Sequence, residues 1–256
     1  MVLRSLVVLG LISAGLSGYS QEQQPTAEKI TEVPAVSPVK KKSSRPDIPG
    51  SIVIELGINL KNGAVPPDFQ KGLWGSRTLN IYYQYPFRLF KSHFSFVPGI
   101  GLSLERWKFT NNYTLNPKPA VNGYYELIPA KNLYPGASID RSQLVNNYFE
   151  MPIEFRYDTN PEDIARSFHF VVGGRIGVLY DSFTKIDYIE NSESKSNKDK
   201  QWHGMENFRY GMYGRVGLGG FSIFTYYNIS PMFQPNKGPL GTQMNSVTIG
   251  ISVNGF

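Results

Sequence analysis

Acidic and basic side chains alternate with apolar ones along parts of the chain, and such groups could transfer protons, bind ions or form salt bridges. In the segment NYFEMPIEF, residues 147–155, Glu150 and Glu154 stand between apolar residues and Arg156 follows on the same side. Residues two apart in a β-strand lie on one face of a sheet. This segment therefore has an apolar face and a charged face, and the chemistry open to its charges depends on which face lies inside.

The histidines and serines do not form a recognisable catalytic pattern. His93 and His169 fall at or near short connections, whereas His203, in NKDKQWHGMEN, lies in a long connection that also carries Ser192, Ser194 and Ser196. No fixed spacing pairs a nucleophile with a base, and no metal-ligand, phosphate-binding or nucleotide-binding motif is present. We therefore predict no catalytic, cofactor-binding or metal-binding residue and interpret His203 as a solvated loop residue.

The elements that position these residues are expected to be strands, because no segment after residue 50 has a helical period. Period-2 patterns cover residues 51–60, 78–87, 94–109, 145–157, 168–183, 208–218, 221–230 and 244–256. Long connections (61–77, 110–144, 184–207 and 231–243) alternate with shorter ones (88–93, 158–167 and 219–220). This alternation predicts an all-β fold, an eight-stranded antiparallel up-and-down barrel with both termini at the short-turn end.

The direction of the apolar face separates two kinds of barrel, because a soluble lipocalin-like barrel turns it inward and a membrane barrel turns it outward. The polar face consists of Gly, Ser, Glu and Arg, with lysine only at strand ends, as at Lys108. The apolar runs are about 10 residues long, which suits a tilted membrane-spanning strand. Aromatic residues gather toward the short turns, as in an interfacial girdle: Tyr83, Tyr85, Phe87, Phe94, Tyr157 and Phe168. These features favour a transmembrane barrel, so Ile54→Arg or Leu102→Arg should impair insertion and Gly101→Ser should be mild.

The runs YFEMPIEFRYDTNPED and FHFVVGGRIGVLYDSFTK, together with VPGIGLSLERWKF, resemble segments of a known family. They are similar to the small outer-membrane β-barrel proteins of Bacteroidota, the PorT-like or "porin family" barrels. The resemblance covers residues 51–256 and implies a β-barrel in the outer membrane. Because that family is functionally mixed, the resemblance implies no particular activity.

An outward apolar face places the strand charges inside the barrel. The predicted lumen charge network consists of Glu55, Glu105, Glu150, Glu154, Arg156, Arg175, Asp181, Arg209 and Arg215. An eight-stranded barrel is just wide enough for its side chains to fill it, and a buried charge left without a partner is costly. The network is either a structural plug or a gated path for ions, and the barrel size favours the plug.

The second long connection is rich in tyrosine, a residue that offers rigid amphipathic contact area. Tyr113, Tyr124, Tyr125 and Tyr134 form a candidate partner-binding loop, and the alternative is a self-packed loop over the barrel mouth. The terminal Phe256 resembles an outer-membrane sorting signal. It has the parity of the polar face, so a bulge near Asn254 and Gly255 is required to direct it toward lipid.

The N-terminal residues indicate export. Residues 1–20 combine Arg4, an apolar run and small residues before a cleavage site, as in a secretory signal peptide. Residues 21–49 form a linker rich in Pro, Lys and Ser that we expect to be disordered, and residues 50–256 form the barrel. The net charge of +6 does not gather on a face with aromatic residues, which argues against nucleic acid as a partner.

Together these features predict a non-enzymatic outer-membrane barrel with a periplasmic N-terminal tail and C-terminus. It would contact outer-membrane lipid and act through its loops or tail in adhesion, envelope assembly or secretion, with envelope or secretion proteins as candidate partners. The alternatives are a narrow pore for small solutes and, third, a lipid-modifying enzyme. The absence of cysteine excludes a disulfide framework.

Overall fold

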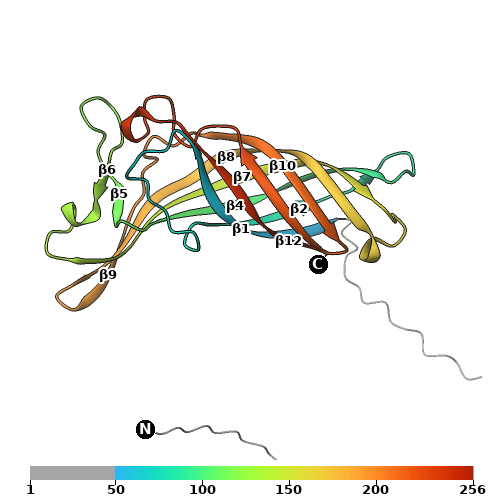
Figure 1. Ribbon diagram of the computed structural model, residues 1–256, viewed down its shortest axis with the longest axis horizontal. Helices are drawn as coiled ribbons and strands as arrows, with labels where there is room; N and C mark the ends of the chain where they lie inside the picture. Colours follow the sequence, from blue (N-terminus) through green and yellow to red (C-terminus); the bar gives the residue numbers. More distant parts are fainter. Residues whose placement is uncertain (1–49, 256) are drawn as a thin grey trace, which may run out of the picture. The chain divides into compact units, whose positions relative to one another are not determined.

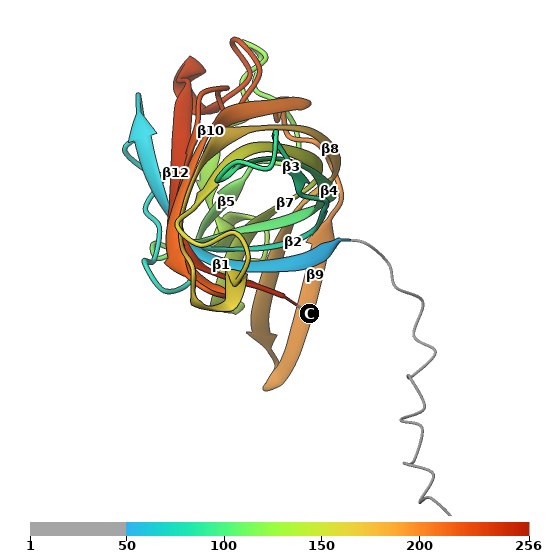
Figure 2. The ribbon, with the colours of Figure 1, turned by 90° about the vertical axis from the view of Figure 1, so that its right-hand side faces the viewer.

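A closed antiparallel ring of eight strands forms the body of the protein. The computed structural model describes residues 50–255, so the predicted signal peptide, linker and Phe256 lie outside the described residues. The ring runs in the order β1 (Ser51–Gly63), β2 (Arg77–Gln84), β4 (Phe94–Phe109), β7 (Ser138–Asp158), β8 (Phe168–Glu190), β10 (Phe208–Leu218), β11 (Phe221–Asn228) and β12 (Met244–Asn254). It closes because β12 pairs with β1, as Figure 2 shows in a view along the barrel. The predicted eight-stranded barrel is confirmed.

Two strands of the ring are longer than their sequence patterns predict. β7 begins at Ser138 and β8 continues to Glu190, inside segments that were expected to be loops. These extensions pair with each other, and β8 also pairs with β9 (Glu193–Asp199) in a hairpin beyond the ring. Their residues mix polar and apolar types, so they lack the period-2 signal of a lipid-facing strand. Figure 1 shows β5, β6 and β9 together at the barrel end opposite the C-terminus.

The remaining elements are short and belong to the connections. They are β3 (Phe87–Arg88), β5 (Tyr113–Leu115), β6 (Leu127–Pro129) and the 3-10 turns η1 (Ala130–Asn132), η2 (Ile164–Arg166) and η3 (Pro239–Gly241). No helix within residues 50–255 is long and apolar enough to cross a membrane. Because neighbouring strands of the ring are antiparallel, the four longer connections lie at one end of the barrel and the three shorter turns lie at the other.

The apolar face of the ring points outward. Leu56 is 54% exposed, whereas its neighbour Glu55 is fully buried, and Ile100 on β4 is 65% exposed. Gly101 faces inward, as predicted, but it packs so closely against β2 that a mild effect of serine is no longer expected. A Cβ at residue 101 would lie 2.1 Å from the Ile81 carbonyl oxygen, so a serine there forces a shift of the backbone rather than a mild change.

The four long connections pack into a cap over one mouth of the ring. Each supplies a buried apolar side chain: Phe69 from the β1–β2 connection, Leu115 from β4–β7, Met205 from β9–β10 and Phe233 from β11–β12. Backbone hydrogen bonds join the connections, including Gln234 N to the Gly204 carbonyl oxygen at 2.8 Å. An apolar core therefore closes the long-loop end.

Candidate functional site

Eight of the nine predicted lumen charges are buried inside the ring, and the structure shows which of them meet. Arg175 on β8 donates to Glu55 on β1 at 2.9 Å, although these strands lie four places apart in the ring of eight. Glu55 also accepts from Tyr213 on β10 at 2.6 Å and from Asn80 on β2 at 2.8 Å. A contact between opposite sides of a closed ring must cross the lumen. The Glu55–Arg175 cluster therefore obstructs the middle of the barrel.

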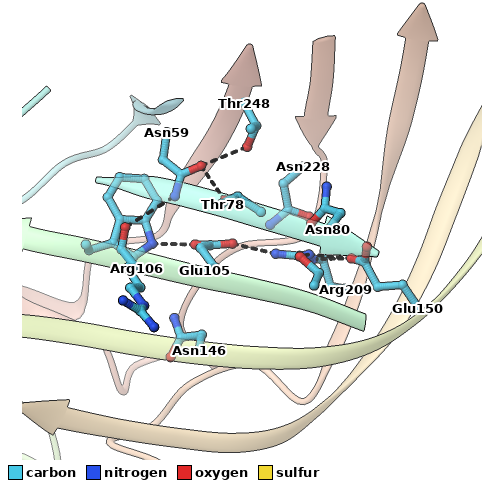
Figure 3. Close-up of polar contacts among 12 residues, drawn as sticks. Asn59, Thr78, Asn80, Glu105, Arg106, Asn146, Glu150, Arg209, Asn228 and Thr248 are labelled. Carbon is cyan, nitrogen blue, oxygen red and sulfur yellow. Dashed lines mark hydrogen bonds and ion pairs between the residues drawn. The ribbon is translucent and has the colours of Figure 1, made fainter. Parts of the chain in front are cut away.

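A second cluster lies around Arg209 on β10, nearer to the cap. Its guanidinium donates to Glu150 on β7, with 2.8 Å from Nε to Oε1, and to Glu105 on β4. Figure 3 shows Arg209 between these two carboxylates. The ring of Tyr148 lies 3.9 Å from the guanidinium carbon. One arginine therefore serves two carboxylates from different strands, a role for which its planar fork is suited and the lysine point charge is not.

Two further pairs lie nearer to the short turns. Arg215 donates to Glu154 at 3.1 Å and to the Ser252 hydroxyl at 3.2 Å. Arg156 donates twice to Asp158, at 2.9 and 2.7 Å, and so makes no pair with the other predicted lumen charges. Charge pairs therefore occupy several successive levels of the lumen.

Asp181 was predicted to join the lumen network, and the structure contradicts this. The register of β7 and β8 shifts between Asn147 and Tyr148, so that Tyr148 pairs with Leu179 and Asn147 with Asp181. The extra residue, Tyr180, reverses the inward parity of β8 beyond it. Asp181 therefore shares the outward side of Asn147, whose amide donates to its carboxylate at 3.1 Å.

Aromatic residues of the inward parity complete the network, and the sequence analysis did not include them. The Tyr82 hydroxyl donates to Glu150 and accepts from Arg175 at 3.2 Å. The Trp107 indole donates to Glu105, and the ring of Tyr213 lies 3.8 Å from the Arg175 guanidinium carbon. The signal was available, because Trp107 and Tyr213 lie at an even spacing from a buried charge on their own strand, and Tyr82 lies at an even spacing from the buried polar residue Asn80.

The four tyrosines of the candidate partner-binding loop divide into two pairs. Tyr125 packs against the cap core and meets His203 edge-on at 5.7 Å, and Tyr124 lies against Gly241. Tyr113 lines a polar groove of about 430 Å³ with Asn111, Asn112, Lys131 and Ser138. Tyr134 lines a second groove of about 320 Å³ with Thr184, Asn197 and Asp199. The loop is thus self-packed over the mouth, as one alternative predicted, and two of its tyrosines still line surface grooves.

Each of the three histidines has one ring nitrogen in a hydrogen bond. His203 is fully buried, which corrects the expectation of a solvated residue, and its two nitrogens face the Gln201 carbonyl oxygen at 2.7 Å and Asp199 at 3.4 Å. Burial lowers the pKa of His203 from its ordinary value of 6.5, although Asp199 opposes this shift. His169 meets the Ser222 hydroxyl at 2.9 Å, but both residues are buried in the lumen. Neither arrangement pairs an accessible nucleophile with a base.

Within residues 50–255, no group of His, Cys, Asp and Glu is arranged to hold a metal ion. The charges of the lumen are instead matched with one another. What the geometry offers chemically is a polar interior crossed by ion pairs and a folded cap with two surface grooves.

Comparison with known proteins agrees with this architecture. A family model described as outer membrane protein beta-barrel domain matches residues 42–234. Among solved structures, the attachment invasion locus protein Ail of Yersinia pestis is similar at 12% identity, over 80% of this chain and 97% of that chain, with a TM-score of 0.32. Neisserial surface protein A is similar at 10% identity, over 80% and 96% of the two chains, with a TM-score of 0.31. No curated protein matches the chain significantly.

Proposed function

Because the chain belongs to the outer membrane protein beta-barrel domain family, we propose that it is a non-conducting, non-enzymatic barrel that acts by contact, through its cap. The observation that carries this proposal is the set of ion pairs across the lumen, above all Arg175–Glu55 between opposite strands. A lumen crossed at several levels by paired side chains leaves the cap as the surface available for function. We therefore favour a function in contact through the cap over a function in transport.

In this proposal the cap faces the cell exterior, and the N-terminal and C-terminal residues of the barrel domain face the periplasm. Residues 1–20 then act as the export signal and residues 21–49 as a periplasmic tail. Within the family, the runs YFEMPIEF and FHFVVGGRIG favour an affiliation with the PorT-like barrels of Bacteroidota. The role is adhesion or another surface contact, with envelope assembly or secretion as the alternative roles for the same surface.

The two grooves of the cap suit a hydrophilic ligand such as a glycan. Amide, hydroxyl and ammonium groups line them beside Tyr113 and Tyr134, and such groups can hydrogen-bond to sugar hydroxyls while the aromatic rings support apolar faces. The second groove lies between the β8–β9 hairpin and the β4–β7 connection, where Asn197 donates to the Tyr134 hydroxyl at 2.6 Å. The hairpin therefore holds one wall of this groove in place.

Orientation can be measured directly because the chain contains no cysteine. A cysteine at Val121, a fully exposed residue of the β4–β7 connection, should react with a membrane-impermeant maleimide on intact cells. A cysteine at Phe90, which is 98% exposed in a short turn, should react only after the outer membrane is permeabilised. The reverse pattern would contradict the proposed orientation.

The contact role is tested by shortening the hairpin. Replacing residues 187–196 with two glycines removes most of β9 and the contact between Tyr188 and Tyr134, but leaves the pairing of Phe208 with Val178 that closes the ring. We expect the wild-type barrel to be retained on a surface of immobilised mucin glycans and the shortened barrel to be lost from it. Lys195→Gln is the matched control, since it changes a hairpin side chain and keeps the backbone. Equal retention of the shortened and wild-type barrels would contradict a contact role for the cap.

A further inference from the structure

Two arginines stand directly opposite each other on the outer wall of the barrel. Arg77 on β2 and Arg106 on β4 are Cα partners in the ladder, and both are exposed on the outward face. Like charges at opposed positions of a sheet repel each other and destabilise the pair. An anion between the two guanidinium groups would remove that repulsion.

Neither arginine finds a carboxylate among the described residues. Within residues 50–255 no ion pair involves Arg77 or Arg106, whereas the outward acids of β8 have partners on β7 and β8. Asp187 meets Arg141 at 3.4 Å and Lys185 at 3.1 Å, and Asp181 accepts from Asn147. Among the described residues, the positive charge of Arg77 and Arg106 is therefore not balanced by an ion pair.

The turn that precedes β2 packs beside a third cation, Lys108 of β4, and carries an aromatic residue. Gly75 lies so close to the Lys108 side chain that a Cβ there would be 2.6 Å from Lys108 Cδ, which places this turn over the outer wall. At its tip Trp74 is 78% exposed and Leu73 is 50% exposed. Tryptophan is enriched where a membrane protein crosses from hydrocarbon to headgroups.

The height of the pair along the barrel matches the headgroup level. The outward positions of β4 are apolar from Phe94 to Leu104, and Arg106 is the next one. With a rise of about 3.3 Å per residue and a tilt of about 40°, these positions span about 25 Å, the height of the apolar band of such barrels. On β2, which runs antiparallel to β4, the outward residues Tyr83, Ile81 and Leu79 form the same apolar run. Arg77 is the next outward residue toward the cap. The two arginines therefore lie where a lipid phosphate lies and where hydrocarbon ends.

We propose that Arg77 and Arg106, with Lys108 and Trp74, bind the phosphate of a membrane lipid headgroup. The guanidinium fork binds phosphate through two parallel hydrogen bonds, which a lysine ammonium cannot do. A lipid fits better than a free anion because the site continues into the apolar wall below it and is flanked by Trp74. The site does not depend on which side of the membrane the cap faces, so its failure and that of the proposed function are distinguishable.

Native mass spectrometry of the full chain released from nanodiscs tests the proposal. The nanodiscs contain phosphatidylcholine alone, or phosphatidylcholine with either phosphatidic acid or oleate. We expect a phosphatidic acid molecule to be retained, and oleate, which has negative charge without phosphate, to be retained far less. Excess inorganic phosphate should not displace the lipid. Equal retention of oleate, or full displacement by inorganic phosphate, would overturn the proposal.

The paired substitution Arg77→Gln with Arg106→Gln should weaken phosphatidic acid binding about tenfold or more. The matched control is Arg166→Gln with Lys118→Gln, which removes two exposed cations elsewhere and should leave binding unchanged. An equal loss in the control would show that net charge alone is responsible. If the glutamine variant does not fold, Arg77→Lys with Arg106→Lys decides the question. Binding several-fold weaker than wild type supports recognition by the guanidinium fork, and wild-type binding overturns it.

Discussion

Two buried guanidinium groups of the lumen, those of Arg175 and Arg209, each contact several groups from different strands. Arg175 donates to Glu55 and Tyr82 and lies over the ring of Tyr213, and Arg209 donates to Glu105, Glu150 and Ser103. An ion removed from water is stabilised only when its remaining donors are also satisfied. The aromatic rings and hydroxyls of the inward face therefore stabilise the buried arginines together with the carboxylates.

Arg175→Met should destabilise the barrel strongly, because it leaves Glu55 buried without its cation. Removal of one partner of a buried ion pair typically costs ~3–5 kcal/mol of unfolding free energy. Urea unfolding of the barrel in lipid vesicles, followed by the gel-mobility shift on boiling, measures the change. The double variant Glu55→Gln with Arg175→Met should recover much of the loss, since no charge is left unpaired. A single variant as stable as wild type would show that Arg175 does not hold the network together.

His203 should make the cap sensitive to acid. Burial lowers its pKa below 6.5, so an opened cap binds a proton more readily than the closed one. As the pH falls through about 6.5, His203 of the open cap takes up a proton, and the free energy of opening the cap decreases. The decrease ends once the pH is below the depressed pKa of His203 in the closed cap. Amide hydrogen exchange near Met205 and Gln234 should therefore accelerate, after correction for the intrinsic rate, between about pH 7.5 and about pH 5. In His203→Gln this added acceleration should disappear. If it persists in that variant, a group other than His203 is responsible.

At the scale of the strand, the sequence was sufficient to orient side chains and insufficient to pair them across the lumen. The period of two places Glu55 and Leu56 on opposite faces whatever the rest of the fold does, and the composition of the two faces then directs Glu55 inward. The single extra residue at Tyr180 leaves no mark in the alternation before it, and so Asp181 was placed on the wrong face. The partners of Arg175 and Arg209 depend on how the strands are staggered around the closed ring, which no single strand encodes.

A charged substitution on the outward face should destabilise the barrel only where that face meets lipid. Leu56→Arg should cost ~2–4 kcal/mol if the residue lies near the midplane of the membrane, because the guanidinium enters hydrocarbon. Leu240→Arg is the matched control, since Leu240 is 65% exposed but lies in the β11–β12 connection of the cap. Insertion into vesicles, followed by the mobility shift, should fail or weaken for Leu56→Arg alone. Equal tolerance of both changes would mean that the face carrying Leu56 does not meet lipid.

At the scale of the whole molecule, two cores of different chemistry close the barrel. Ion pairs and tyrosines fill the lumen between the short turns and the level of Arg209, and the apolar core of Phe69, Leu115, Met205 and Phe233 fills the mouth beneath the loops. The polar core sets the shape of the ring, because its contacts span strands that are not neighbours. The apolar core packs the four long connections together, and this packing holds them in place as a cap.

The polar core of the lumen and the apolar core of the cap predict how the barrel should behave in a planar bilayer. The wild-type protein should pass little steady current, because a solute would have to break the Arg209 and Arg175 clusters in turn. The barrel with the shortened β8–β9 hairpin should also stay closed, since both clusters lie below the cap. Arg175→Ala combined with Arg209→Ala should leak, because stranded Glu55, Glu105 and Glu150 would draw water or protons into the lumen. A parallel recording from a known porin supplies the open reference. Large steady conductance from the wild-type barrel would instead make it a pore, and the network of lumen charges would then line a path for ions rather than block one.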